Sequence, residues 1–260
     1  MKGQDILGNI AILKFGRGES AAKKKKEALE FMREHRNVKT ALEKSDKFKG
    51  RLRTLKAKYI AGEKTKEALY RENGCEFRLN VESCYFSPRL ASERKEIADM
   101  TEKGESVLVM FGGVAPFAIV IAKTKKPALV VSVELGKECC KYAAANVKRN
   151  KLEGNVEIIQ GDVRKVLPKM AKKKMKFERI VMARPNLKDS FLDAAFPLAK
   201  KRAVIHYYGF YEANKAGEMK SMIDKEAGKA GRKIKIMRIK KAGDIGVRKF
   251  RYRADVKVVK

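Results

Sequence analysis

The fold is decided by the sequence VLVMFGGVAP at residues 107–116. Its four leading apolar residues predict a buried strand, the two adjacent glycines predict a tight turn, and the proline marks the start of a helix. At the carboxyl end of a strand in an open parallel sheet, small residues let backbone amides approach a ligand closely. This stretch therefore predicts the strand, turn and helix of a Rossmann-like unit.

Short apolar runs and helical runs alternate through the same part of the chain. This order is typical of α/β proteins with a mainly parallel sheet. Two β-rich runs at residues 233–240 and 249–259, joined by a turn that contains glycine, are expected to add an antiparallel edge. The expected strands are Val107–Met110, Ala128–Val133, Val156–Gln160, Arg179–Met182 and Ala203–Tyr207, and the expected helices are Pro116–Ala122, Lys137–Arg149, Leu187–Ala195 and Lys215–Ala227.

The chain before Pro88 has a different pattern. Ile6–Phe15 is a β-rich apolar run, so we expect a strand there, and Lys23–His35 carries apolar residues at helical spacing. From Cys75 to Val81, apolar residues alternate with mostly polar ones. We therefore predict two domains, a small α+β domain at residues 1–87 and a Rossmann-like α/β domain at residues 88–260.

The chain is strongly basic. Lys and Arg number 62 against 31 Asp and Glu, which gives a formal net charge of +31. Such a charge attracts polyanions, of which nucleic acid is the commonest and an anionic membrane is the next candidate. A basic proteome would give part of this positive charge to any of its proteins. The sequence contains neither a membrane-spanning apolar run nor a signal-peptide pattern, so we expect a cytoplasmic protein with no membrane contact.

Cysteine and histidine do not indicate a metal site. The four cysteines lack metal-ligand spacing, and the chain has two histidines. We therefore expect reduced, structural thiols and no metal.

Residues at the ends of three successive predicted strands suggest a cofactor pocket. Gly113 lies in the glycine turn, Glu134 ends the second strand in a position suited to ribose hydroxyls, and Asp162 follows the third strand, where it is suited to an adenine amino group. The alternative is a Rossmann-like unit that uses glycine for packing and acids for solubility. A glycine turn and two acids on consecutive strand ends favour the pocket.

Two stretches resemble a known family. The run YFSPRLASER at residues 85–94, followed by MFGGVAPF at residues 110–117, resembles the archaeal and eukaryotic guanosine-37 N1 tRNA methyltransferases. The resemblance continues through residues 5–11, 71–74 and 204–208, and so covers nearly the whole chain. It implies a class I methyltransferase domain that transfers a methyl group from S-adenosylmethionine to N1 of the guanosine beside the tRNA anticodon.

The resemblance also implies roles for individual residues. Glu93 stands at the family's general-base position, and Arg53 matches the arginine that binds the guanine and stabilises charge on O6. Tyr85, Arg89 and Phe111 correspond to cofactor-pocket residues, with Arg89 suited to the methionine carboxylate. The alternatives are a solvated helix surface for Glu93, phosphate contact or plain exposure for Arg53, and core packing for the two aromatic residues.

The sequence departs from the family pattern at two motifs. Val109 replaces an aspartate at the end of the first strand, and Ala115 replaces a glycine of the turn. At the fourth strand the family's Asn-Leu-Pro, which holds the guanine, becomes Ala183-Arg184-Pro185, with Asn186 as the nearest amide. Two alternatives stay open, a non-catalytic tRNA-binding relative and an enzyme that acts on another tRNA position or transfers another part of the donor.

The chain begins where the family's middle domain begins. We therefore expect it to lack the N-terminal domain with which many archaeal members inspect the tRNA elbow. Recognition would then fall on the anticodon stem-loop, bound by the basic surface of a monomer and read by the catalytic pocket.

Overall fold

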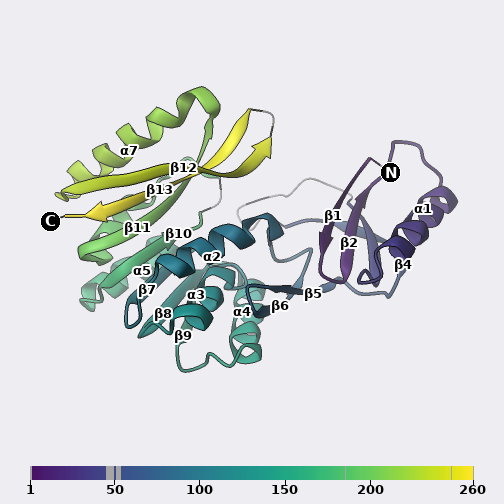
Figure 1. Cartoon of the computed structure of the whole chain (residues 1–260), viewed down its shortest axis with the longest axis horizontal. Coiled ribbons are helices and arrows are strands. Elements are labelled where there is room, and N and C mark those ends of the chain that lie inside the picture. Colours follow the sequence, from purple (N-terminus) through teal and green to yellow (C-terminus); the bar gives the residue numbers. More distant parts are fainter. Residues whose placement is uncertain (1, 45–49, 51–53, 185, 247, 260) are drawn as a thin grey trace.

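The N-terminal unit lies at one end of an elongated molecule (Figure 1). The computed structural model describes residues 2–44, 50, 54–184, 186–246 and 248–259. The unit is a four-stranded sheet with one helix against it. Its strands, in spatial order, are β1 (Gly3–Leu7), β2 (Ile10–Lys14), β3 (Thr40–Lys44) and β4 (Ala57–Gly62), and the helix is α1 (Ala21–Glu34).

The prediction of one strand at Ile6–Phe15 is wrong, because the run folds into the hairpin of β1 and β2. Gly8 at the turn has φ of +57°, and a Cβ there would lie 1.8 Å from the carbonyl oxygen of Leu69. Only glycine fits a left-handed conformation at so close an approach. The helix predicted at Lys23–His35 is confirmed, and its N-terminus is capped by the Ser20 hydroxyl, which accepts from the amide of Lys23.

A second hairpin connects the two units. It consists of β5 (Glu67–Glu72) and β6 (Cys75–Asn80), and β6 packs against α4 (Lys137–Arg149). Phe77 on β6 is fully buried in the same apolar cluster as the helices of the larger unit. Because the apolar positions of β6 alternate, one face of the hairpin is buried against that unit.

The larger unit is a seven-stranded sheet in the order β12-β13-β11-β10-β7-β8-β9. Its five strands from β11 to β9 are parallel, and β13 pairs antiparallel with both β11 and β12. The predicted mainly parallel sheet with an antiparallel edge is therefore confirmed. The strands are β7 (Ser106–Met110), β8 (Leu129–Glu134), β9 (Val156–Gln160), β10 (Phe177–Met182), β11 (Ala199–Glu212), β12 (Ile234–Gly246) and β13 (Lys249–Val258).

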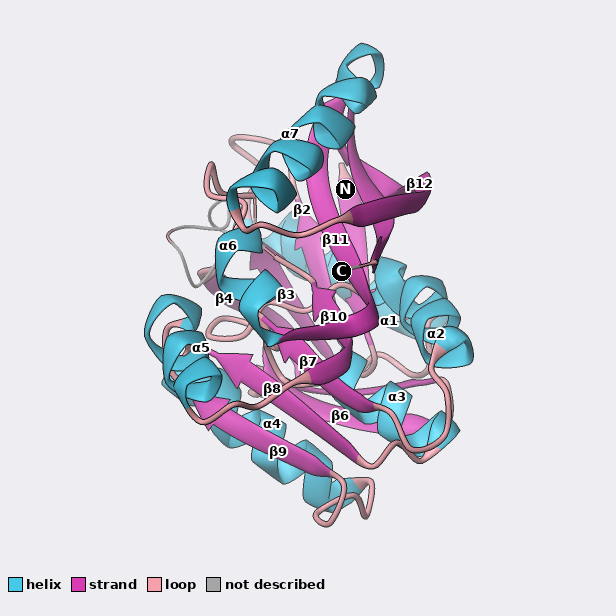
Figure 2. Ribbon diagram, turned by 90° about the vertical axis from the view of Figure 1, so that its left-hand side faces the viewer, coloured by secondary structure: helices cyan, strands magenta, loops and turns pink. Residues whose placement is uncertain are grey.

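Helices cover both faces of this sheet (Figure 2). The helices α5 (Val163–Lys172), α6 (Leu192–Ala195) and α7 (Ala216–Lys229) pack on one face, and α2 (Ala91–Met100), α3 (Pro116–Lys125) and α4 pack on the other. The chain turns in opposite directions on the two sides of β7, since β8 follows it on one side and β10 on the other. Such a switch point is where open α/β sheets bind ligands, beyond the carboxyl ends of the strands.

Two element predictions need correction. The helix expected at Leu187–Ala195 begins only at Leu192, because Phe191 has φ of +60° and its amide donates to the Asp189 carboxylate. The strand expected at Ala203–Tyr207 extends over Ala199–Glu212, since it pairs with the long β13. Across the described ranges, no helix has the length and apolarity that a bilayer crossing requires.

Candidate functional site

A pocket opens at the carboxyl ends of the central parallel strands. Most of its walls come from the segments that directly follow β7, β8, β9 and β10, and the rest comes from the segment before α2 and from β11 and β13. The lining residues are Tyr85, Leu90, Phe111, Gly113, Phe117, Val133, Glu134, Leu135, Cys139, Gly161, Asp162, Val163, Ala183, Arg184, Leu187, Tyr208 and Arg251.

The glycine turn forms one wall because its backbone is unusually tight. Phe111, Gly113 and Ala115 all have positive φ, at 61°, 57° and 65°. A Cβ on Gly112 would lie 2.1 Å from the Ser132 hydroxyl oxygen, so no larger residue fits between β7 and β8 there. The turn therefore brings main-chain atoms to the edge of the pocket, as the sequence predicts.

The Glu134 carboxylate fastens this turn to the end of β8. One oxygen accepts from the amide of Gly113 at 2.8 Å, and the other accepts from the amide of Gly136 at 2.7 Å. A carboxylate oxygen has two lone pairs, so each oxygen retains capacity to accept a hydroxyl group. Glu134 can therefore hold both the turn and a ribose.

Asp162 caps the helix that follows β9. Its carboxylate accepts from the amide of Arg164 at 2.9 Å, and it lies in the pocket wall. The adjacent Gly161 and Val163 also line the pocket. The acid at the end of the third strand, Asp162, therefore lies in the pocket wall.

The structure brings together most of the predicted cofactor and substrate residues. Tyr85, Phe111, Gly113, Glu134, Asp162 and Ala183 all line this pocket.

Two of the predicted residues lie outside this pocket. The Arg89 side chain is 78% exposed and forms an ion pair with Asp5 at 2.8 Å. Asn186 is exposed and is not among the lining residues. Arg53 and Pro185 lie outside the described residues.

Glu93 is buried one side chain behind the pocket wall. It is 6% exposed, which rules out the solvated helix surface. Its carboxylate accepts from the hydroxyl of Tyr208 at 3.0 Å and from Arg253 at 2.7 Å, and it forms an ion pair with Lys240 at 2.6 Å. Since Tyr208 lines the pocket, one hydrogen bond connects this carboxylate to the pocket wall.

A buried ion pair fixes the helix that carries Glu93. The guanidinium of the next residue, Arg94, is bidentate to Glu72 on β5 and donates to the carbonyl of Ser87 at 3.0 Å. It also lies over the ring of Phe86, 4.9 Å from the centroid. The first turn of α2 is thus attached to the connecting hairpin, which fixes the place of Glu93.

Arg184 lines the pocket, although it was not predicted as a site residue. This side chain is 6% exposed, donates to the carbonyls of Leu187 and Asp189, and lies over the ring of Tyr207. Among the described residues its Nε has no hydrogen-bond partner. The rule that ligands bind beyond strand ends identifies Arg184, because it follows β10 directly.

Tyr208 and Arg251 were missed for a different reason. They lie on β11 and β13, and they reach the pocket through the pairing of these two strands. The register of that pairing has no local signal in the sequence.

The two substitutions in the cofactor motif are accommodated below the pocket. Val109 and Ala115 are fully buried in the apolar cluster that includes α3, and neither lines the pocket. Their side chains therefore pack the core and do not narrow the site. Within the described part of the chain, no group of three or more His, Cys, Asp or Glu side chains is placed to hold a metal.

Comparison with known proteins gives consistent relatives. Residues 68–237 match the model of the TRM5/TYW2 methyltransferase domain. The chain is 38% identical to tRNA (guanine(37)-N(1))-methyltransferase Trm5b of Pyrococcus abyssi, over 90% of this chain and 68% of the relative. It is 32% identical to tRNA (guanine(37)-N(1))/4-demethylwyosine(37)-methyltransferase Taw22 of Nanoarchaeum equitans, over 98% of this chain and 99% of the relative.

Solved structures agree with these relatives. The crystal structure of Trm5b from Pyrococcus abyssi superposes with a TM-score of 0.87 at 34% identity, over 99% of this chain and 75% of the other. TYW2 of Methanocaldococcus jannaschii in complex with AdoMet superposes with a TM-score of 0.75 at 26% identity, over 98% and 99%. The family named from the YFSPRLASER and MFGGVAPF stretches is thereby confirmed, and the chain belongs to the TRM5/TYW2 family of methyltransferases.

Proposed function

We propose that this protein methylates N1 of guanosine 37 in tRNA, with S-adenosylmethionine as the donor and Glu93 as the general base. The observation that carries the proposal is the buried Glu93 carboxylate, hydrogen-bonded to Tyr208 in the wall of the pocket. The Pyrococcus abyssi relative is named for this reaction, and the Nanoarchaeum equitans relative is named for it together with a second substrate.

The pocket residues fit the donor. Glu134 offers acceptors for ribose hydroxyls, Asp162 offers an acceptor for the adenine amino group, and Phe111 offers an apolar face. Arg89 is paired with Asp5 outside the pocket, so a donor carboxylate would bind Arg184 or Arg251, the two guanidinium groups in the lining. This assignment replaces Arg89 as the carboxylate partner.

The chemistry requires a base because the N1 lone pair of neutral guanine belongs to the amide-like ring system. When bound, S-adenosylmethionine would supply a methyl group on a positively charged sulfur, and this sulfur would leave as a neutral thioether with the electron pair of the broken bond to the methyl carbon. Glu93 takes the N1 proton, so that the N–H bond breaks and its electron pair becomes available on N1 to form the bond to the methyl carbon. Arg53 remains our candidate for stabilising the negative charge that develops on O6.

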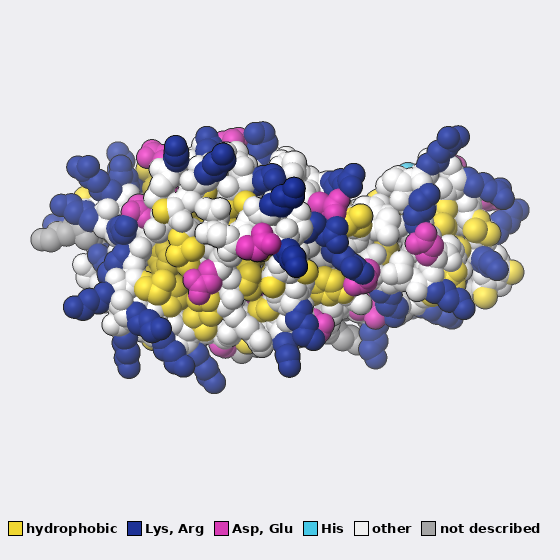
Figure 3. All heavy atoms as spheres, turned by 90° about the horizontal axis from the view of Figure 1, so that it is seen from below, with side chains coloured by type: hydrophobic (Ala, Val, Ile, Leu, Met, Phe, Trp, Pro, Cys, Tyr) yellow, Lys and Arg dark blue, Asp and Glu magenta, His cyan; other side chains and the backbone are white. Residues whose placement is uncertain are grey.

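The tRNA contact falls on the anticodon stem-loop and on residues 1–87, which we propose to act as an RNA-contacting domain. Lys and Arg side chains stand all along the outline of the molecule, with few acidic side chains between them (Figure 3). Such a surface binds the phosphate backbone without reading sequence. Selection of the guanine is then left to the pocket.

Methyl transfer to a tRNA transcript with guanosine at position 37, beside an adenosine-37 transcript, tests this function. We expect methylation of the first transcript alone. Glu93→Gln should lower the single-turnover rate by about 10²- to 10⁴-fold, the usual contribution of a general base. Glu102→Gln, which changes an exposed acid just beyond α2, is the control. An unchanged rate in Glu93→Gln would contradict the mechanism.

A second substrate is favoured by one specific observation. Arg184 places a cation where the family motif has leucine, and the Taw22 relative is named for 4-demethylwyosine as well as guanine. Mass spectrometry of tRNA treated with the enzyme separates N1 methylation from methylation of such a base and from aminocarboxypropyl transfer. Calorimetry with S-adenosylmethionine tests the non-catalytic alternative, which requires that no binding occurs even with tRNA present.

A further inference from the structure

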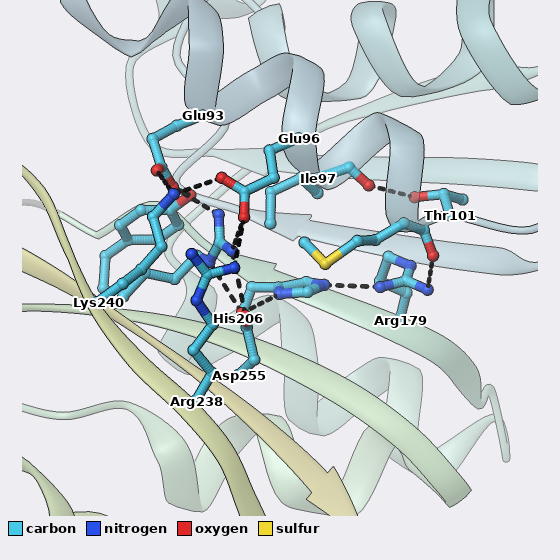
Figure 4. Close-up of polar contacts among 12 residues, drawn as sticks. Glu93, Glu96, Ile97, Thr101, Arg179, His206, Arg238, Lys240 and Asp255 are labelled. Carbon is cyan, nitrogen blue, oxygen red and sulfur yellow. Dashed lines mark hydrogen bonds and ion pairs between the residues drawn. The ribbon is translucent and has the colours of Figure 1, made fainter.

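Behind Glu93, an unbroken line of hydrogen-bonded polar side chains, four of them charged, crosses the sheet (Figure 4). Arg253 on β13 donates from Nη1 to Glu93 at 2.7 Å and from Nε to Asp255 at 2.9 Å. Asp255 also contacts Nδ1 of His206 at 2.6 Å, and Nε2 of His206 contacts Arg179 at 2.7 Å. All five side chains are buried.

The far end of this line is also fixed. Arg179 on β10 donates from Nε and Nη2 to the two carboxylate oxygens of Glu105, at 2.7 and 2.9 Å, and from Nη2 to the carbonyl of Met100 at 2.5 Å. Met100 is the last residue of α2, the helix that carries Glu93 in its first turn. The line therefore joins both ends of α2 to the sheet.

The contacts define the protonation state of His206. A guanidinium has only donors, so Nε2 of His206 must accept from Arg179, and the ring proton lies on Nδ1, where it is donated to Asp255. The imidazole is therefore neutral. Its burial, which lowers the pKa of His206 despite the hydrogen bond to Asp255, agrees with this state.

We propose that Arg253, held in place by Asp255 and His206, is a positioning residue that fixes the orientation of the Glu93 carboxylate for proton abstraction. The inference rests on the proposed function, because it takes Glu93 as the base. Arg253 is not itself a lining residue of the pocket, and it acts through Glu93 and Tyr208.

The two oxygens of Glu93 are not equivalent. Among the described residues, Oε2 accepts hydrogen bonds from both Arg253 and Tyr208, whereas Oε1 forms an ion pair with Lys240. A carboxylate oxygen has two lone pairs, so Oε1 is the atom with one lone pair left to take a proton. In this step an O–H bond forms at Oε1 of Glu93 and the N1–H bond of the guanine breaks. The electron pair of the broken bond stays on N1 of the guanine. Arg253 thus determines which oxygen is anchored and which is reactive.

Lys240 has a second partner that lets Oε1 take up this proton. Its ammonium group is also hydrogen-bonded to Glu96, one turn along α2 (Figure 4). When Oε1 becomes neutral, Lys240 keeps Glu96 as its counter-ion. Arg253 likewise contacts Glu96, through Nη2 at 2.7 Å. After protonation of Glu93, Lys240 and Arg253 therefore each still contact a carboxylate.

Charged and titratable groups face Glu93 from each element that packs against it. Glu96 lies on the same helix, Tyr208 on β11, Lys240 on β12 and Arg253 on β13. Arg238 on β12 contacts Glu96 at 3.1 Å, and Asp255 and His206 lie behind Arg253. Arg253 and Lys240 are the two cations in direct contact with this carboxylate, and a cation next to a carboxylate favours the charged form.

The test uses the full chain, single-turnover methyl transfer to the guanosine-37 transcript, and a pH series. Arg253→Lys keeps the charge but loses the planar fork, so the rate should fall about 100-fold, the effect of a misplaced catalytic group. Affinity for S-adenosylmethionine should stay within about twofold. Arg253→Met should also move the acid limb of the pH–rate profile to higher pH. Wild-type rates and profiles in both variants, or a rate loss that parallels a loss of donor affinity, would overturn the proposal.

Lys240→Met tests the proposal if the Arg253 variants do not fold. The Lys240 side chain is 21% exposed, so its replacement should destabilise the fold less than replacement of the buried Arg253. It should move the acid limb to higher pH, whereas Lys241→Met should not, since the neighbouring Lys241 pairs with the exposed Asp244. An acid limb at the same pH in both variants would overturn the proposal.

Glu93→Gln separates failure of this inference from failure of the proposed function. Full activity of Glu93→Gln means that the base is wrong and that the positioning role fails with it. If Glu93→Gln is inactive while the Arg253 and Lys240 variants keep wild-type rates and pH–rate profiles, only the positioning role is wrong.

Discussion

At the scale of single residues, His206 and Asp255 are each held in one protonation state by their surroundings. Burial lowers the pKa of His206 and outweighs the hydrogen bond to Asp255, which acts in the opposite direction. Burial alone would raise the pKa of Asp255, but hydrogen bonds from His206 and Arg253 outweigh it and lower this pKa to about 2. The Glu96 carboxylate behaves like Asp255, with a pKa of about 2 set by Arg253 and Lys240 against the effect of burial.

These shifts predict that the free energy of unfolding falls in two stages as the pH is lowered. Below pH 6.5, which is the ordinary pKa of histidine, His206 binds a proton in the unfolded chain but stays neutral in the folded protein. The free energy of unfolding therefore falls first in this pH range. Below about 4, the unfolded chain protonates Asp255 and Glu96 while the fold keeps them ionised, and this contribution is lost as the pH approaches 2. Chemical denaturation at a series of pH values measures both stages.

The variant His206→Asn serves as the control for the upper stage. An asparagine retains a donor toward Asp255 but has no group that titrates, so the fall between pH 7 and pH 5 should shrink while the lower stage persists. If the wild-type protein and His206→Asn lost the same free energy over that interval, His206 would not be the titrating group.

At the scale of elements, two asparagines on α4 hold the connecting hairpin as a neighbouring strand would. Asn146 accepts from the amide of Arg78 at 2.7 Å and donates to its carbonyl at 3.1 Å. Asn150, one turn later, accepts from the amide of Glu76 at 3.0 Å and donates to its carbonyl at 2.7 Å. Each side-chain amide satisfies both main-chain groups of one residue on β6, so the helix completes the hydrogen bonding of the strand edge.

Asn146→Ala should therefore destabilise the protein by about 1–3 kcal/mol, because it leaves the part-buried amide and carbonyl of Arg78 without this partner and removes the buried hydrogen bond to the carbonyl of Val114. Urea denaturation measures the loss, and hydrogen exchange should show faster exchange at the Arg78 amide. The matched change is Asn155→Ala, since the half-buried side chain of Asn155 makes no hydrogen bond with any described residue. Equal stability of the two variants would contradict this role.

The elements also show how far the sequence predicts this site. Gly113, Glu134 and Asp162 were predictable because parallel strands bring their carboxyl ends to one edge of the sheet. Arg253 and Lys240 were not predictable, because they reach Glu93 through antiparallel pairing of β11, β12 and β13, whose register has several irregularities. A local pattern predicts an element and its exposed face, whereas the register between distant strands depends on the assembled core.

At the scale of the whole molecule, the excess of positive charge is concentrated on the surface. The carboxylates of Glu72, Glu93 and Asp255 are buried in ion pairs with arginine or lysine. Lys and Arg side chains therefore dominate the outline of the molecule in Figure 3, with Asp and Glu side chains scattered among them. A surface of this kind binds a polyanion by releasing its counter-ions, and the resulting affinity depends on salt.

The dependence of tRNA affinity on salt should therefore be steep. With six to ten phosphate contacts, the affinity falls by about 10³- to 10⁵-fold between 50 and 200 mM salt. The S-adenosylmethionine affinity, measured by calorimetry in the same buffers, should change little because the pocket is mainly apolar and the donor carries little net charge.

If residues 1–87 contact tRNA, the double variant Lys25→Ala and Lys26→Ala on α1 should reduce the slope of log affinity against log salt by about 2, one for each lost contact. The same change in a Lys172→Ala and Lys173→Ala variant at the end of α5, with none in the α1 variant, would place the tRNA on the other unit.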